Sequence, residues 1–118
     1  MKESVLKNKS YDFAILIVNT YKSIYTNKKE FTLSRQLLKS GTSIGANIRE
    51  AEFAQSSKDF INKMSIALKE SNETEYWLSL LKDTDYIGID VFNKLTSFNK
   101  ELLKMLVSTI NTMKSKIK

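Results

Sequence analysis

Three glutamates lie close together in the chain and are the first side chains that could do chemistry: Glu70, Glu73 and Glu75. Clustered carboxylates can hold metal ions, and di-iron helical bundles combine them with the histidines of Glu-x-x-His motifs. The chain has no histidine, so that arrangement is absent. On a helix, Glu73 and Glu75 would also point about 200° apart, because they are two residues apart. The sequence therefore predicts no metal site and no paired acid and base.

Glu75 is the unusual member of this group, because helical periodicity directs its side chain between Met64, Leu68 and Ser71. A carboxylate buried among such residues has to be paired or hydrogen-bonded. We therefore expect a structural role for Glu75, with a binding or catalytic role as the alternative. Its predicted partners are Arg35, Arg49 and a polar row in the preceding helix, formed by Gln36, Ser40, Ser43 and Asn47.

The serines and glycines give little support for catalysis. Ser40, Ser43 and Ser71 have no histidine to activate them, which leaves only a pairing of serine with lysine open. Gly41 and Gly45 fall within a helical pattern and form no phosphate-binding loop. We expect a binding or assembly protein rather than an enzyme, with no catalytic residue, no cofactor and no small-molecule substrate.

A group of lysines near the C-terminus is the strongest candidate for a binding surface. Residues 91–118 carry six lysines and one glutamate, in a chain whose net charge is +6. Four of these lysines fall within an arc of about 80° on one helix, and such a face neutralises phosphates without reading bases. Few aromatic residues accompany them, so base stacking is not expected there, and a solvated helix face is the alternative. The predicted nucleic-acid-binding residues are Lys100, Lys104, Lys114 and Lys118, followed by Arg35 and Arg49.

Four helices would position these side chains. Apolar residues recur at helical spacing over residues 4–25, 31–54, 58–83 and from 90 almost to the end of the chain. The chain has no proline, and short polar segments join the helices. The sequence therefore predicts an all-α protein, a single antiparallel up-down-up-down four-helix bundle over residues 1–118. We expect neither a signal peptide nor a membrane span, and the absence of cysteine is compatible with the cytoplasm.

The second predicted helix carries two adjacent stripes. Its apolar face consists of Leu33, Leu37, Ile44, Ile48 and Ala51, and the polar row described above lies beside that face. Small or hydrogen-bonding residues in such a row let a neighbouring helix come close. Gly41 and Gly45 each cost a helix interior about 1 kcal/mol relative to alanine, so close packing should compensate for them.

The predicted helix ends rest on capping residues. Thr32 is expected to cap the second helix, with Phe31 packing onto the following turn. Ser56, followed three residues later by Asp59, is typical of a capping box for the third helix. Asp90 is a good candidate for the N-cap of the fourth helix.

The third predicted helix carries a second apolar facet, which points away from its own core face. A helix in a monomeric bundle needs only one apolar face, so a second one normally marks an interface. We therefore predict self-association through this facet, unless the fourth helix or a loop covers it. The predicted oligomer-interface residues are Ile66, Tyr76, Trp77 and Leu80.

Several segments of the chain together resemble a known family. They are Arg-Gln-Leu at 35–37, Ser-Ile-Gly-Ala-Asn-Ile-Arg-Glu at 43–50, Ala-Leu at 67–68 and Asn-Glu-Thr-Glu-Tyr-Trp-Leu at 72–78. This pattern is similar to that of the bacterial four-helix-bundle proteins encoded within 23S ribosomal RNA intervening sequences, which are also called S23 ribosomal proteins. That family is in turn similar to the accessory variability determinant of diversity-generating retroelements.

The resemblance implies an antiparallel four-helix bundle that assembles into a homopentamer. For the retroelement relatives it also implies a basic surface that engages RNA and a reverse transcriptase. It implies no enzymatic activity. Two functions therefore stay open. One is an oligomer that binds RNA or a nucleic-acid enzyme through its basic surface, and the other is a protein-interaction scaffold with no specific nucleic-acid partner.

Overall fold

The computed structural model describes residues 2–117, and these residues are almost entirely helical. Its elements are α1 (Lys2–Ser23), a single π-helical turn η1 (Ile24–Lys28), α2 (Leu33–Ala51), α3 (Ser57–Asp83) and α4 (Ile89–Lys116). The described part of the chain contains no strand. None of its helices is both long and apolar enough to cross a membrane. The molecule measures 49 × 21 × 20 Å, as expected for long helices lying side by side.

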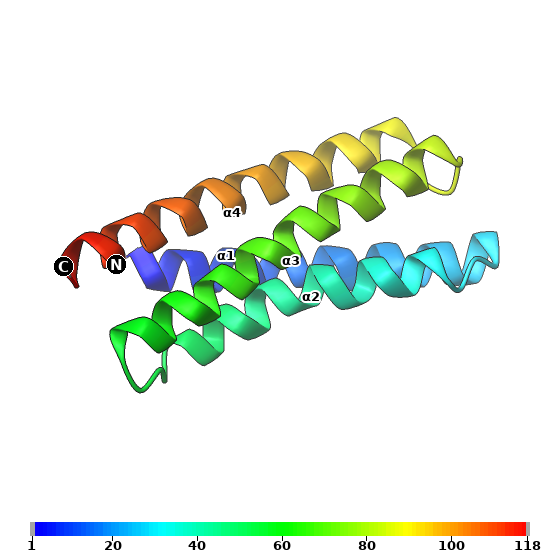
Figure 1. The fold of residues 1–118 in the computed structure, drawn as a ribbon. Helices are drawn as coiled ribbons and strands as arrows, with labels where there is room; N and C mark the ends of the chain where they lie inside the picture. The colour runs from blue at the N-terminus through cyan, green and yellow to red at the C-terminus, as the bar shows by residue number, and fades with distance from the viewer. Residues whose placement is uncertain (1, 118) are drawn as a thin grey trace.

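The helices run up, down, up and down, which confirms the predicted topology (Figure 1). Each helix packs against two others, in the order α1, α2, α3, α4 and back to α1. The helices α2 and α4 therefore occupy opposite corners of the bundle. The start of α1, the end of α4 and the connection between α2 and α3 lie together at what we term the terminal end. The turn η1 and the connection between α3 and α4 lie at the other end, which we term the turn end.

The apolar stripes of the four helices meet in one core. Full burial of a leucine or isoleucine side chain contributes about 1.5–3 kcal/mol, so this core is the main source of stability. The apolar face predicted for α2 is buried except for Leu33, which is half-buried. Phe60, Leu68 and Met113 are also half-buried. The buried apolar residues are Leu6, Phe13, Ile17 and Ile24; Leu37, Ile44, Ile48 and Ala51; Met64, Ala67, Leu78 and Leu81; and Leu95, Leu102, Leu106 and Ile110.

Gly41 and Gly45 lie where α2 passes close to α1. A Cβ atom added to Gly41 would lie 2.8 Å from Cγ1 of Ile17, and one added to Gly45 would lie 3.3 Å from the backbone oxygen of Ser10. Both distances are shorter than an optimal carbon contact of about 3.5–4.0 Å. The close approach of the two helices therefore compensates for the helix propensity that the glycines give up, as the sequence predicts.

Only one residue of the polar row in α2 bonds another helix. The buried Ser40 accepts a hydrogen bond from the hydroxyl of Thr74 in α3, over 3.0 Å. Ser43 and Asn47 instead donate to carbonyl groups of their own helix, and Gln36 is exposed. Fewer residues of the row bond α3 than the pattern predicts, because serine and asparagine side chains can donate hydrogen bonds to carbonyl groups one turn earlier in their own helix.

A second buried polar contact joins α3 to α4. The side chain of Asn99, which is fully buried, donates from Nδ2 to the backbone oxygen of Ser71 over 2.9 Å. Its Oδ1 accepts a hydrogen bond from Ser71 Oγ over 2.8 Å. No buried side-chain nitrogen or oxygen in the described part of the chain lacks a partner. The apolar periodicity of the sequence does not reveal Asn99, because asparagine adds nothing to an apolar pattern.

Replacing Asn99 by leucine should lower the free energy of unfolding by about 1–3 kcal/mol, because the hydroxyl of Ser71 then stays buried without this partner. The double substitution Ser71→Ala with Asn99→Leu should recover most of that loss, because it removes both polar groups. Urea denaturation of the wild type, both single variants and the double variant measures the coupling. A double variant as unstable as Asn99→Leu alone would contradict a stabilising hydrogen bond between the two side chains.

Glu30 caps α2, so the prediction that Thr32 does so was wrong. The Glu30 carboxylate accepts hydrogen bonds from the backbone N–H groups of Thr32 (3.0 Å), Leu33 (2.9 Å) and Ser34 (2.8 Å). Thr32 has helical φ and ψ angles, and its side chain makes no capping bond. Burial raises the pKa of Glu30, but the backbone donors together lower it by more, so this pKa lies below its ordinary value.

The capping residues predicted for the starts of α3 and α4 are confirmed at α3 and wrong at α4. At α3, Ser56 Oγ accepts a bond from the N–H of Asp59 over 3.0 Å, which confirms the capping box. The Asp59 carboxylate accepts a return bond from the N–H of Gln55 over 3.2 Å, one residue earlier than in the usual motif. At α4, the N-cap is Gly88 and Asp90 lies in the first turn, so Asp90 is not the cap.

Replacing Glu30 by glutamine should lower the free energy of unfolding by about 1 kcal/mol near neutral pH, because the charged acceptor of three N–H groups is lost. The pKa of Glu30 is lowered in the folded state. Its contribution is therefore fully present above the unfolded-state pKa and is lost as the pH falls through the folded-state pKa. Thermal unfolding over a pH series should show the gap between wild type and variant closing in acid. A gap that stays constant would exclude this capping role.

Candidate functional surfaces

The exposed residues Lys100, Lys104 and Lys114 form a lysine face on α4. None of the three makes an ion pair with another residue in the range 5–117, whose side chains the structure describes. The neighbouring acid, Glu101, pairs instead with Lys9 of α1. The fourth predicted lysine, residue 118, lies outside the described residues. Within the described part of α4, the lysine face therefore carries positive charge that no ion pair neutralises.

Arg35 and Arg49 are not part of the lysine face. Both are exposed on α2, which occupies the corner of the bundle opposite α4. They also lie about 21 Å apart along the axis of α2, because the helix rises 1.5 Å per residue. The Arg49 guanidinium lies 6.0 Å from the ring centroid of Tyr11, within reach of a cation–π contact. The basic residues that the sequence groups together thus lie on separate surfaces.

The second apolar facet of α3 is partly open to solvent. Tyr76 is 61% exposed and lies edge-on to Trp77, with 4.9 Å between the ring centroids. Trp77 is half-buried and packs against the core. Leu80, one turn further on, and Ile66, about 16 Å back along the helix axis, are half-buried too. Trp77 therefore stabilises the fold of the single chain, and Tyr76 is the residue of this facet that is most available to a partner.

Glu75 is half-buried rather than enclosed, contrary to the sequence prediction. It makes no ion pair with Arg35, Arg49 or any other residue between 5 and 117. The buried positions of this part of α3 are Thr74 and Leu78, so the Glu75 carboxylate lies at the edge of the core and keeps contact with water. No group of three or more histidine, cysteine, aspartate or glutamate side chains within the described range is placed to hold a metal ion.

Glu70 is a carboxylate whose environment shifts its pKa. Burial raises the pKa of Glu70, and the negative charge of Glu73 raises it further. Lys39 and Lys69 lower it by less, so the pKa of Glu70 lies above its ordinary value. Since desolvation is the largest cause, the shift follows from packing at the surface between α2 and α3 and does not indicate an acid–base pair.

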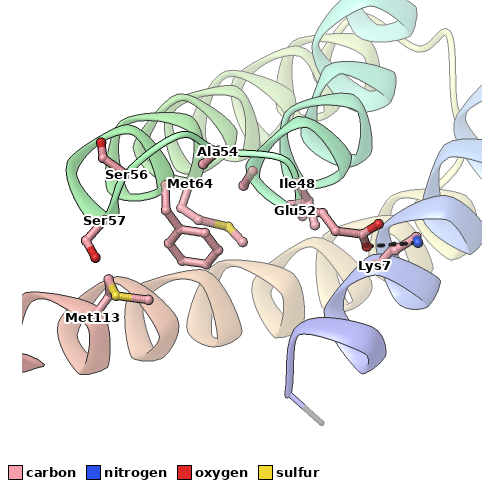
Figure 2. A pocket seen from close by; sticks show the side chains of 10 residues that line it. Lys7, Ile48, Glu52, Ala54, Ser56, Ser57, Met64 and Met113 are labelled. Atoms are coloured by element: carbon pink, nitrogen blue, oxygen red, sulfur yellow. Dashed lines mark hydrogen bonds and ion pairs between the residues drawn. The ribbon is translucent and has the colours of Figure 1, made fainter.

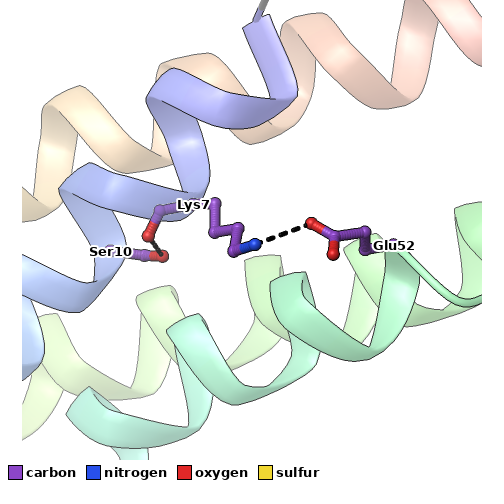
Figure 3. Close-up of polar contacts among 3 residues, drawn as sticks. All are labelled: Lys7, Ser10 and Glu52. Carbon is purple, nitrogen blue, oxygen red and sulfur yellow. Dashed lines mark hydrogen bonds and ion pairs between the residues drawn. The ribbon is translucent and has the colours of Figure 1, made fainter.

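A hollow of about 350 Å³ opens at the terminal end of the bundle (Figure 2). Residues from all four helices line it, among them Ile48 of α2, Met64 of α3 and Met113 of α4. At its rim, Lys7 Nζ of α1 lies 2.9 Å from Oε1 of Glu52, the C-terminal cap of α2 (Figure 3). The hollow therefore has an apolar lining and a paired charge at its edge.

The two charged side chains at the rim of the hollow pair with each other. These residues, Lys7 and Glu52, bond each other across α1 and α2. Ser10, one turn further along α1, donates to the backbone oxygen of Lys7 over 3.0 Å (Figure 3). Sequence reasoning missed this hollow because its residues come from four separate segments, and no periodic signal links them.

The comparisons with known proteins agree with each other. The chain matches the family model described as 23S rRNA-intervening sequence protein over residues 2–108. It is also similar to the crystal structure of a protein of unknown function from the S23 ribosomal protein family of Bacteroides thetaiotaomicron. That protein is 56% identical in sequence, with a TM-score of 0.93 over 94% of this chain and 99% of the other. Among curated proteins there is no match. The chain therefore belongs to the 23S rRNA-intervening sequence protein family.

Proposed function

We propose that this chain is a non-enzymatic, self-associating cytoplasmic protein that binds RNA through the lysine face of α4. The observation that carries the proposal is the positive charge of Lys100, Lys104 and Lys114, which no described residue neutralises. Such a face favours a phosphate backbone, because each phosphate that a lysine neutralises releases bound counterions. The resemblance to the retroelement determinant, which implies a basic surface that engages RNA, favours RNA over DNA as the partner.

The spacing of the lysine face suits a nucleic-acid backbone. Lys100 and Lys104 lie one helical turn apart, and Lys114 lies about 15 Å further along the axis. The face therefore extends about 21 Å along the axis of α4, a length that covers several consecutive phosphates of one strand. Lysine amines contact phosphates as point charges on flexible stems. The proposal therefore assigns phosphate contacts to this face and no reading of bases.

The double substitution Lys100→Glu with Lys104→Glu should weaken binding to a structured RNA by at least about tenfold, because two attractive contacts become repulsive. It should also reduce the slope of log affinity against log salt by about 2. Fluorescence anisotropy with a labelled RNA hairpin across a salt series measures both quantities.

A matched control is the double substitution Lys58→Glu with Lys69→Glu, which reverses two exposed lysines on α3. This control changes the net charge of the chain by the same amount. It should weaken RNA binding less than the change on α4. Equal losses in the two double variants would mean that only net charge matters, which would contradict a binding face on α4.

Self-association is the second part of the proposal. Tyr76 is an exposed aromatic residue beside the half-buried Trp77, and aromatic residues are enriched at interfaces. The family resemblance gives five as the expected number of subunits. Assembly would repeat the +6 charge of each chain, and several lysine faces on one particle would bind a single RNA with increased avidity.

Replacing Tyr76 by aspartate should lower the oligomeric mass, because a carboxylate would be buried unpaired in the interface. Tyr76 is a better target than Trp77, because Trp77 also packs against the core. Multi-angle light scattering measures the mass, and circular dichroism checks that the helices remain. The control Tyr11→Asp, at a 58% exposed site on α1, should keep the wild-type mass. A Tyr76→Asp variant with wild-type mass would remove this facet from the interface.

A protein-interaction scaffold is the alternative function. The facet around Tyr76 and Trp77 favours it, because apolar surface attracts proteins and not phosphates. Under this alternative, the intact oligomer would bind RNA only at low salt, as any basic protein does.

A further inference from the structure

The turn end of the bundle carries aromatic rings that remain open to solvent. Tyr25 of η1 is 46% exposed, and Phe31, in the segment before α2, is 44% exposed. Their ring centroids lie 4.7 Å apart, and Tyr21 lies 5.8 Å from Tyr25 on the other side. Phe31 thus packs backward onto η1, whereas the sequence pattern predicts contact with the turn that follows it. The result is a short row of rings across the connection between two helices.

Four exposed cations lie within four residues of these rings in the sequence: Lys22, Lys28, Lys29 and Arg35. None of them makes an ion pair with a side chain of residues 5–117. Glu30 is the only acidic residue between positions 13 and 49. Its carboxylate is occupied by the three backbone N–H groups at the start of α2 and is therefore poorly placed to neutralise a lysine. The turn is both aromatic and positively charged.

Lys29 holds a backbone conformation that a lysine rarely adopts. It ends the π-helical turn in the left-handed region, with φ 55° and ψ 33°. Glycine or asparagine is the usual choice there, because other residues crowd their own Cβ atom. A lysine at this position gives up stability and adds a charge next to the rings. An unfavourable conformation of this kind is a reason to look for a function.

We propose that Tyr25, Phe31 and the cations beside them bind an unpaired nucleotide of single-stranded RNA, with its base stacked on the rings and the adjoining phosphates at Lys28, Lys29 and Arg35. Aromatic rings next to a basic surface are the arrangement that binds single strands, because every base has a face that can stack. In a duplex the bases are already stacked on each other and are not available. The inference rests on the proposed RNA binding, and it adds a second surface with a different preference from the lysine face of α4.

This assignment separates the roles of the two predicted arginines. Arg35 lies in the first turn of α2, close in sequence to Phe31 and Lys29. We therefore assign it to the proposed single-strand site. Arg49 lies at the far end of α2, against the ring of Tyr11. Removal of the Arg35 charge should therefore affect single-strand binding, whereas removal of the Arg49 charge should not.

The test compares two RNA probes in the full-length protein: a single strand of about 20 uridines and an RNA duplex of the same length. The variant Tyr25→Leu with Phe31→Leu keeps apolar bulk and removes the stacking faces. It should bind the single strand about tenfold more weakly, with an unchanged salt slope and unchanged duplex binding. The matched control Tyr11→Leu with Phe53→Leu replaces a tyrosine and a phenylalanine that are 58% and 75% exposed elsewhere, and it should bind both probes normally.

A second variant tests the charge without endangering the fold. Lys29→Gly should raise the melting temperature, because glycine tolerates the positive φ. It should nevertheless weaken single-strand binding and reduce its salt slope by about 0.7, as expected for one lost phosphate contact. The control Lys58→Ala removes one exposed lysine at the terminal end and should change neither probe's affinity appreciably.

Three results would overturn the inference. If the leucine variant binds the single strand as the wild type does, the rings do not stack bases, while the proposed RNA binding is unaffected. If it loses single-strand and duplex binding equally, or loses oligomeric mass in light scattering, the rings serve structure or assembly. If the wild type binds neither probe near physiological salt, both this inference and the proposed function are wrong.

Discussion

A buried polar group needs a hydrogen-bond partner, and this constraint fixes how the four helices meet. The helix α3 carries two such groups: Thr74 bonds Ser40 of α2, and Ser71 bonds Asn99 of α4. A slide of α3 by one turn along α4 would leave the Asn99 side chain buried and unpaired, at about 1–3 kcal/mol. A slide along α2 would break the bond between Thr74 and Ser40, although each of these hydroxyls also donates to a carbonyl group of its own helix. Apolar side chains define the relative position of the helices less strictly, because a core tolerates many substitutions of one apolar side chain by another of similar volume. The two contacts therefore fix the positions of α2 and α4 along the bundle axis, and with them the positions of the surfaces on these helices.

The angular spacing of residues on a helix accounts for the charge on α4. Successive residues of a helix point about 100° apart, so three neighbours can face three directions. Asn99 points into the core, and Glu101 pairs with Lys9 of α1. Lys100, between them, is left exposed. Helical geometry thus separates a lysine and a glutamate that are adjacent in the sequence, and the RNA binding proposed for the lysine face depends on this separation.

The four helices and their apolar faces could be predicted because a helical repeat is a property of one segment of sequence. Contacts between segments could not be predicted, because no periodic signal in one segment specifies its partner in another. Thr32 and Glu30 are both plausible acceptors for the start of α2, and the path of the turn through Lys29 at positive φ decides between them. In the same way, charge alone groups Arg35 with the lysines of α4. The bundle topology puts α2 and α4 at opposite corners. Asn99 gives no apolar signal, although it is as buried as the leucines around it.

The two surfaces proposed for RNA differ in the physical origin of their affinity. Binding at the lysine face depends on counterion release and weakens steeply with salt, whereas stacking on Tyr25 and Phe31 responds to salt much less. Neither surface is a deep pocket, so each contributes modestly in a single chain. Self-association would repeat both surfaces around one particle, and the second contact with the same RNA would then benefit from a high effective concentration. A rigid helical bundle suits this division, because it keeps shallow sites at fixed positions without the cost of ordering them on binding.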